Sequence, residues 1–128
     1  MLQHQQKYPK PIALKRCKHV TIKNITIRNA PNYAISVLGT DYVNIDGVNI
    51  FNGYCDGIDT DSCRHVRIAN CQIETWDDAI VHKASFSIGI RRQVANFKSQ
   101  TLSLCPSGKR NRCLVVRIIV ERISLGLV

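Results

Sequence analysis

A ten-residue pattern occurs three times in this chain, and each copy begins 23 residues after the one before. The copies begin at Val20, Val43 and Val66. In each copy, apolar and polar residues alternate as they do in half-buried β-strands. A fixed period of about 20 to 50 residues is typical of solenoids, in which each repeat stacks on its neighbours and shares a core with them. The repeat therefore predicts a solenoid of short strands.

Each copy contains two apolar pairs with a bend between them. In the first copy the pairs are Val20 with Ile22 and Ile25 with Ile27, so the alternation breaks after Ile22. The chain must turn there if both pairs are to face the same core. Glycine and asparagine adopt positive φ at the lowest cost. They occupy the bend in all three copies, as Asn24, Gly47 and Asn70.

A third apolar run follows each copy and completes one turn of the solenoid. These runs are residues 34–37, 57–60 and 79–81, and their equivalent isoleucines are 23 and 22 residues apart. Three short strands per turn predict an all-β parallel β-helix in which equivalent residues stack about 4.8 Å apart. Asn29 and Asn52 share one column and are expected to form a stacked amide ladder. Ordinary hairpins are the alternative, which the spacing of the strands disfavours.

The repeats account for residues 1–90, and the rest of the chain has a different character. The predicted β-helix has only three to four turns, and both of its ends would be open sheet edges. The chain begins within a half-repeat at residues 11–19, which favours a fragment of a longer solenoid. Residues 91–128 are predicted to be a divergent basic tail, because 91–112 contains no 23-residue echo. An end cap, a segment foreign to the repeats and a shifted reading frame are the alternatives for this tail.

The net charge of +9 is concentrated in the tail. Residues 1–83 carry 10 basic and 8 acidic side chains, a difference of +2, whereas residues 84–128 carry 8 and 1, a difference of +7. A basic segment can bind nucleic acid or an acidic polymer. No nucleic-acid motif accompanies the charge, and the aromatic residues of this segment are only Phe86 and Phe97. We therefore expect no nucleic-acid partner.

Neither a membrane span nor a signal peptide is predicted. The apolar run 114–128 is interrupted by Arg117, Glu121 and Arg122, which favours a final strand or a short amphipathic helix over a span. Residues 1–6 lack the basic start and apolar run of a signal peptide. The sequence itself therefore does not determine the localisation.

The six cysteines are expected to form neither a disulfide framework nor a zinc site. Cys17 and Cys63 are 46 residues apart, so two turns and about 9.6 Å separate them in one column, beyond the reach of a disulfide. Cys71 stands at the inward position of Ile25 and Val48 in the other copies, so it is expected to be a small core residue. No Cys-x-x-Cys pair occurs, and we expect no metal and no cofactor.

Acidic residues gather at the third run of two successive turns. Counting back two residues from Ile58 and Ile80 places Asp56 and Asp78 in one column, with Asp77 beside them. Carboxylates about 5 to 8 Å apart repel one another, so at least one proton should be retained. Folding gains nothing from such a cluster. Glycoside hydrolysis does, because one acidic group protonates the leaving oxygen while another activates water.

Two neighbouring aspartates are interpreted differently. Asp59 and Asp61 follow Asp56 in the same run. Aspartate is common at corners and loop ends, where its side chain bonds to nearby backbone. We therefore interpret Asp59 and Asp61 as structural.

Three motifs within residues 55–83 carry a family resemblance. They are Asp56-Gly-Ile-Asp59, Ser62-Cys-Arg-His-Val-Arg-Ile68 and Asp77-Asp-Ala-Ile80, with Lys83 shortly after them. Together they resemble glycoside hydrolase family 28, the polygalacturonases and rhamnogalacturonases that cut pectin. The family pattern is Asn-Thr-Asp-Gly-Ile-Asp, then Ser-Cys-x-x-Val-x-Ile, then Gly-Asp-Asp-Cys-Ile and a lysine. The likeness extends over residues 11–89, and residues 28–35 resemble the family's Arg-Asn-Ser-Pro stretch.

The resemblance implies a right-handed parallel β-helix that hydrolyses galacturonan or rhamnogalacturonan with inversion and without a metal. By position, Asp77 would be the general acid, and Asp56 and Asp78 would hold and deprotonate the attacking water. Lys83 would lie near the site, unless it is a solvated lysine at a strand end. His82 occupies an aliphatic position of the motif and is expected to be a structural histidine on a strand face. The family also implies an acidic plant-type polysaccharide as partner, a monomer, and a secreted or periplasmic location.

The sequence departs from the family pattern in several places. The Asn-Thr before the first aspartate reads Tyr54-Cys55 here, and the glycine before the aspartate pair reads Trp76. Trp76 would either stack on a sugar as part of the substrate-binding site or cover apolar surface. No Gly-His-Gly or convincing Arg-x-Lys motif follows, so part of the family's binding site is missing. A non-catalytic β-helix that binds carbohydrate or serves as a spacer, and a calcium-dependent lyase, remain alternative functions.

Overall fold

The computed structural model describes residues 7–90, 92, 95–100 and 116–120, the last two ranges as backbone strands. These residues form twelve β-strands. No helix in this described part of the chain is long and apolar enough to cross a membrane. The strands are β1 (Ile12–Lys15), β2 (Lys18–Lys23), β3 (Thr26–Arg28), β4 (Ile35–Leu38), β5 (Asp41–Asp46), β6 (Asn49–Gly53), β7 (Ile58–Asp61), β8 (Arg64–Ala69), β9 (Gln72–Thr75), β10 (Ile80–Ala84), β11 (Ala95–Gln100) and β12 (Val116–Val120).

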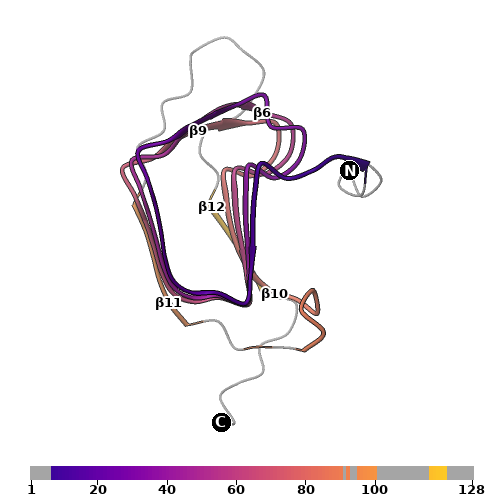
Figure 1. The fold of residues 1–128 in the computed structure, drawn as a ribbon, viewed down its shortest axis with the longest axis vertical. Coiled ribbons are helices and arrows are strands. Elements are labelled where there is room, and N and C mark those ends of the chain that lie inside the picture. The colour runs from indigo at the N-terminus through magenta and orange to yellow at the C-terminus, as the bar shows by residue number, and fades with distance from the viewer. Residues whose placement is uncertain (1–6, 91, 93–94, 101–115, 121–128) are drawn as a thin grey trace.

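The strands form three parallel sheets, each of the first three turns contributes one strand to each sheet, and β10, β11 and β12 extend two of them. The sheet orders are β1-β4-β7-β10-β12, β11-β8-β5-β2 and β3-β6-β9. Every strand pairing is parallel. Figure 1 looks along the stack, so successive turns lie over one another around a shared interior. The predicted parallel β-solenoid is confirmed.

The register of the sheets reproduces the sequence period. Val20, Val43 and Val66 pair directly in β2, β5 and β8, at steps of 23 residues. The step of 22 in the third run has a local cause. β6 pairs with β9 through a register shift between Ile50 and Gly53, which absorbs one residue.

The predicted corners have the expected backbone conformation. Asn24, Gly47 and Asn70 have φ of 54°, 66° and 54°. Asn52 Nδ2 donates to Asn29 Oδ1 at 2.7 Å, so the predicted amide ladder is present. A further column of left-handed residues, which the sequence analysis missed, lies at the start of β2, β5 and β8. It consists of His19, Tyr42 and His65, whose rings stack with centroids 4.8 and 4.6 Å apart.

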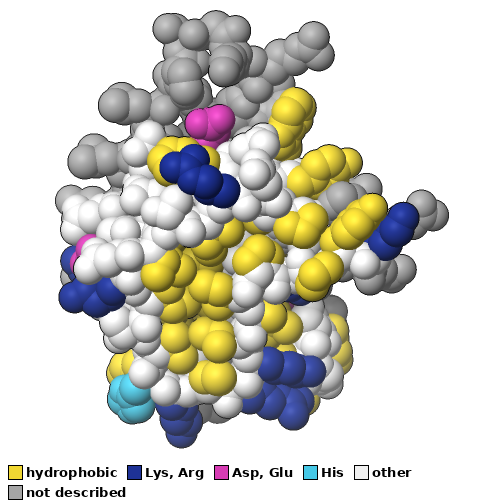
Figure 2. Space-filling model, turned by 45° about the horizontal axis from the view of Figure 1, so that its top comes forward, with side chains coloured by type: hydrophobic (Ala, Val, Ile, Leu, Met, Phe, Trp, Pro, Cys, Tyr) yellow, Lys and Arg dark blue, Asp and Glu magenta, His cyan; other side chains and the backbone are white. Residues whose placement is uncertain are grey.

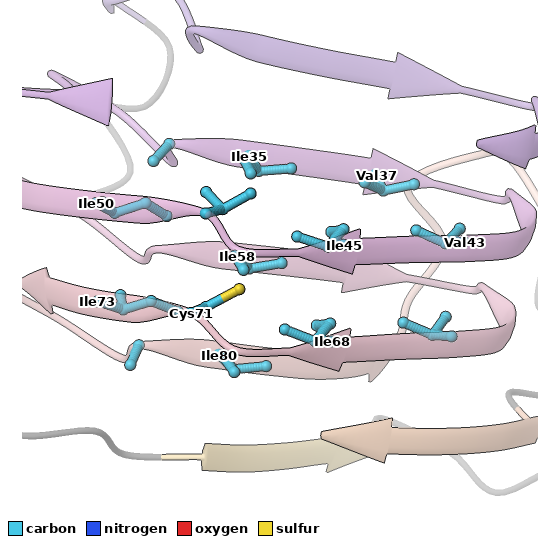
Figure 3. Packing of buried hydrophobic residues seen from close by; sticks show 14 of the residues in the cluster. Ile35, Val37, Val43, Ile45, Ile50, Ile58, Ile68, Cys71, Ile73 and Ile80 are labelled. Carbon is cyan, nitrogen blue, oxygen red and sulfur yellow. The ribbon is translucent and has the colours of Figure 1, made fainter. Parts of the chain in front are cut away.

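The core consists of apolar columns that run along the solenoid axis. Ile35, Ile58 and Ile80 form one such column and are fully buried, and Figure 3 shows them packed against side chains from the other two sheets. Burying an isoleucine side chain contributes about 1.5 to 3 kcal/mol relative to leaving it exposed. Cys71 is 1% exposed and belongs to this core, as predicted.

The first turn covers one end of the core and is itself only partly covered. Its inward side chains are half-buried, and Figure 2, which views this end obliquely, shows hydrophobic side chains gathered across the centre of the visible face. These half-buried residues are Ile12, Leu14, Ile22, Ile25 and Ile27.

The sheets continue after residue 90, although the sequence period does not. β11 pairs with β8 at a step of 31 residues, from Val66 to Phe97, and β12 pairs with β10 at a step of 36, from Ile80 to Val116. Of the two alternatives for residues 114–128, the backbone of β12 agrees with a final strand. The other predictions for the tail lie outside the described residues, and the domain boundary near residue 90 stays a prediction.

Within the described residues, Cys17, Cys63 and Cys71 are free thiols. Their state agrees with the sequence prediction for Cys17 and Cys63. Burial raises the pKa of Cys63 to about 11, so this thiol stays neutral.

Candidate active site

The register of one sheet brings four chemically distinct side chains into a single column. Ile12, Ile35, Ile58 and Ile80 pair in register. The residues two positions before them therefore stack as well, and the backbone bonds Ala34 N–H to Asp56 O (3.1 Å) and Gly57 N–H to Asp78 O (2.9 Å) continue the ladder there. This column consists of Lys10, Tyr33, Asp56 and Asp78.

The three aspartates predicted to be catalytic converge. Asp56, Asp77 and Asp78 each place one carboxylate oxygen within 4.8 Å of the others. The backbone N–H of Asp78 donates to Asp56 Oδ1 at 3.2 Å and to Asp77 Oδ1 at 3.0 Å. The Thr75 hydroxyl donates to the carbonyl oxygen of Asp77 at 3.0 Å, and this bond holds the backbone between the end of β9 and Asp77 in a tight turn. The three carboxylates therefore lie close together, and their catalytic roles stay a prediction.

Gly57 allows the first aspartate to lie this close to the next turn. A Cβ at this position would be 2.5 Å from the carbonyl oxygen of Ala79 and 2.6 Å from Cγ2 of Ile73. Contacts this short require the backbone of one turn to move. The glycine of the Asp-Gly-Ile-Asp motif is thus explained by the close stacking of β7 on β10.

The protonation of Asp56 is strongly perturbed by its surroundings. It is 8% exposed. Burial, followed by the charges of Asp59 and Asp77, raises the pKa of Asp56 to about 8. A proton is therefore held on Asp56 at neutral pH, in agreement with the expectation that the cluster retains one.

The structure corrects the interpretation of Asp59 as a corner residue and agrees with that of Asp61. Both are buried, with 0% and 1% exposure, but Asp59 lies within β7 whereas Asp61 is its last residue, directly before the left-handed Ser62. Asp61 accepts hydrogen bonds from the Ser85 N–H at 2.9 Å, from the Ser62 hydroxyl at 3.1 Å and from the Ser85 hydroxyl. Asp61 therefore has a structural role at the corner, and the next turn covers it as well.

Asp59 forms a buried ion pair with Lys83 on the adjacent strand. Lys83 Nζ lies 2.9 Å from Asp59 Oδ2, and the two side chains are 20% and 1% exposed. Lys83 Nζ also lies 5.2 Å from the centre of the Tyr33 ring. Burial lowers the pKa of Lys83, but Asp59 outweighs it and the pKa is raised, so Lys83 is charged. Lys83 is therefore not a solvated lysine at a strand end.

Asp59 connects this ion pair to the acid cluster. Asp59 Oδ1 is buried and has no hydrogen-bond partner among the described residues. The charge of Asp59 is, after burial, the largest cause of the raised pKa of Asp56, so the two carboxyl groups interact. The Lys83 ammonium favours the ionised form of Asp59, which leaves the proton on Asp56.

His82 has the structural role that the sequence predicted. It is 1% exposed, and its Nδ1 lies 2.6 Å from the Thr60 hydroxyl. Burial lowers the pKa of His82 to about 4, so the ring is neutral at physiological pH. Its position in β10, on the inner side of the strand, keeps it away from proton transfer at the surface.

The family model of glycosyl hydrolases family 28 matches residues 2–124. The chain belongs to this family. It is 30% identical over 86 residues to a protein from Vitis vinifera described as a probable polygalacturonase. That alignment covers 62% of this chain, which spans 18% of the length of the curated relative. No solved structure matches significantly.

Two of the residues at which this family 28 chain departs from the family motif, Tyr54 and Trp76, lie in one surface hollow. The hollow has a volume of about 380 Å³ and is lined by Asn29, Ala30, Pro31, Asn52, Tyr54 and Trp76. Tyr54 and Trp76 are 50% and 54% exposed. Trp76 is therefore not buried as an apolar cover, and the indole N–H donates to Asn52 Oδ1 at 3.3 Å.

Tyr33 is a site residue of this family 28 chain that the sequence analysis did not identify. It lies between Lys10 and Lys83, each with its Nζ 5.2 Å from the ring centre. Burial, opposed by Lys83, raises the pKa of Tyr33 to about 12, so it keeps its proton. The column count that aligned Asp56 with Asp78 would also have found Tyr33, one turn earlier.

The three aspartate oxygens are also close enough together to surround a divalent cation. A cation needs ionised carboxylates. The proton held on Asp56 at neutral pH acts against such binding. We therefore assign no metal to this cluster.

Proposed function

We propose that this chain carries the hydrolytic centre of a pectin-degrading glycosidase that acts on galacturonan or rhamnogalacturonan. The observation that carries the proposal is the convergence of Asp56, Asp77 and Asp78, with one oxygen of each within 4.8 Å of the others. Repulsion makes such a cluster unfavourable for folding, and paired carboxylic groups are what glycoside hydrolysis requires. Membership of glycosyl hydrolases family 28 supports the same reaction class.

In the proposed reaction, Asp77 donates its proton to the glycosidic oxygen as the bond from that oxygen to the anomeric carbon breaks. A water molecule held by Asp56 and Asp78 forms the new bond to the anomeric carbon. The proton of that water passes to a carboxylate. While Asp56 carries its own proton, Asp78 is the member of the pair that can accept this one. The products are two shorter sugar chains, one of them with a new reducing end.

The inverting stereochemistry of this proposal comes from the family resemblance. Inverting glycosidases usually separate their two carboxyl groups by about 6.5 to 9.5 Å. The nearest oxygens of the three aspartates lie within 4.8 Å, which is shorter. The anomeric configuration of the first product, followed by proton NMR, tests inversion directly. A product that retains the substrate configuration would contradict it.

The hydrolase proposal is tested by incubating the purified chain with polygalacturonate and with rhamnogalacturonan and measuring new reducing ends. Replacing Asp77 by asparagine should lower the rate about 10²- to 10⁴-fold, the usual contribution of a general acid. Asp46→Asn is the matched control, because Asp46 lies on another sheet and pairs with Arg67. Its rate should stay within about twofold of the parent rate, since no reacting group changes. Absence of hydrolysis by a folded chain would contradict the proposal.

A carbohydrate-binding β-helix without catalysis is the second candidate. Two observations favour it. The chain spans 18% of the length of its polygalacturonase relative. The exposed rings of Tyr54 and Trp76 lie in a hollow next to the aspartates in sequence. Binding of oligogalacturonide by a folded chain that releases no reducing ends would support this candidate over the hydrolase.

A further inference from the structure

The hollow at Tyr54 and Trp76 is built from the same chain segments as the acid cluster. Except for Asn52, which lies near the end of β6, its lining residues lie on three successive connections, from β3 to β4, from β6 to β7 and from β9 to β10. The second and third connections continue directly to Asp56 and to Asp77. Along the chain, the hollow therefore lies directly before the carboxylates.

The side chains of the hollow have the chemistry of a sugar-binding site. Tyr54 and Trp76 present large rings at half exposure to the same hollow. An aromatic ring packs well against the C–H face of a pyranose, while amide groups bind its hydroxyls. Amides are supplied by Asn29 and Asn52, which line the same hollow.

The position of the Trp76 ring is fixed before any ligand arrives. Its indole N–H donates to Asn52 Oδ1 at 3.3 Å, and Asn52 Nδ2 donates to Asn29 Oδ1 at 2.7 Å. Hydrogen bonds thus connect the Trp76 ring to the side-chain amides of Asn52 and Asn29 across three turns. A preorganised ring loses little conformational entropy on binding, which favours recognition over mere exposure.

The two rings are also among the residues at which this chain departs from its family motif. The motif has asparagine and glycine where the chain has Tyr54 and Trp76. Both replacements are larger, and both face one hollow of about 380 Å³. Two independent departures that enlarge the aromatic surface of one hollow indicate a property particular to this chain.

We propose that Tyr54 and Trp76, supported by Asn52, form a subsite that stacks on one sugar ring of a pectin-type chain and so contributes to substrate selection. The identity of the sugar chain rests on the proposed function, whereas binding at this subsite does not depend on turnover. The stacking face accepts a galacturonate or a rhamnose residue. The two are distinguished by the oligosaccharide used as probe.

Trp76 is the only tryptophan of the chain, so its fluorescence reports directly on the subsite. The full chain with Asp77→Asn is titrated with trigalacturonate and, separately, with a rhamnogalacturonan oligosaccharide. We expect a saturable change in the Trp76 emission with at least one of them. Tyr54→Ala should weaken that binding about tenfold, as expected for loss of one stacked ring. Trp76→Gly, which restores the family residue, should weaken oligosaccharide binding at least as much, as measured by calorimetry.

Tyr42→Ala is the matched control, because Tyr42 is also 50% exposed but lies in the column with His19 and His65. It should leave the affinity unchanged, and circular dichroism should show that each variant is folded. Binding by calorimetry without any change in Trp76 emission would overturn the subsite and leave the hydrolase proposal intact. Equal affinity of Tyr54→Ala and Tyr42→Ala, or no binding of either probe, would also overturn it. Binding that depends on Tyr54 without hydrolysis would support the subsite and contradict the hydrolase.

Discussion

Replacing Lys83 by methionine should destabilise the protein by about 3 kcal/mol, because it leaves the carboxylate of Asp59 buried without its cation. The ion pair is short, with Nζ and Oδ2 2.9 Å apart, and the Asp59 side chain is 1% exposed. Methionine keeps the length and most of the packing of the lysine stem. The measured loss should therefore report the unpaired charge rather than a cavity.

The size of this loss follows from the partial burial of the lysine. Removing one partner of a fully buried pair costs about 3 to 5 kcal/mol. One fifth of the Lys83 side chain remains exposed, so the lower end of this range applies. Burial raises the pKa of Asp59, and Lys83 opposes that rise. Without Lys83 the carboxylate can escape its penalty by taking up a proton, so the loss should be smaller at pH 4 than at pH 8.

Urea unfolding followed by circular dichroism measures this effect in a double-mutant cycle of Lys83→Met and Asp59→Asn. The double variant should be more stable than the sum of the single losses indicates, with a coupling of about 1.5 kcal/mol or more. The exposed pair of Arg67 and Asp46 is the matched control, since its atoms are 2.8 Å apart but its side chains are 50% and 23% exposed. Its coupling should be about 1 kcal/mol or less. A loss in Lys83→Met no larger than in Arg67→Met, or an additive cycle, would refute the reasoning.

Three further predictions concern the acid cluster. Because the folded pKa of Asp56 is raised from 3.8 to about 8, its contribution to stability is present below pH 4 and is lost as the pH rises to 8. Urea unfolding should show that the free energy of unfolding of the wild type falls relative to that of Asp56→Asn as the pH rises from 4 to 8, by at most about 1.4 kcal/mol per pH unit. The same pH dependence in both proteins would contradict this prediction. Gly57→Ala should cost about 1 to 3 kcal/mol in urea unfolding, because the new methyl group meets the carbonyl oxygen of Ala79 at 2.5 Å; an unchanged midpoint would show that the turns are less tightly stacked. EDTA should leave the release of reducing ends unchanged, because the proposed reaction uses no metal, whereas its loss on chelation and return with calcium would favour a lyase.

The features that the sequence predicted well are those in which one residue alone determines the local geometry. Asn24 and Gly47 occupy left-handed corners because few other residues do so at low cost. Cys71 lies in the core because the strand alternation points it there. Once the corners fix the length of a turn, the register follows, and with it the proximity of Asp56 to Asp78.

The features that the sequence did not predict depend on what covers the outer face of a strand. Alternation says which side chains point outward, but all four residues of β7 are buried, so its outward side is covered too. Lys83 and Ser85 from the next turn provide that cover for Asp59 and Asp61. Periodicity also fails when a connection changes length. The steps of 31 and 36 residues to β11 and β12 leave no echo in the sequence, although both strands continue the sheets.

Parallel stacking in register places equivalent residues of successive turns in one column, whatever those residues are. Some columns of this protein therefore stabilise the fold and others destabilise it. A column of isoleucines gains free energy with each added turn, and the paired amides of Asn29 and Asn52 satisfy each other. A column that buries Asp56 beside other carboxylates loses free energy: burial, then the charges of Asp59 and Asp77, and last that of Asp78 raise the pKa of Asp56. The apolar columns therefore stabilise a backbone geometry that the acid column opposes. A register slip of one residue between β7 and β10 would turn Ile80 out of the core as it moved Asp78 away from Asp56, so the buried isoleucines also hold the acid cluster together.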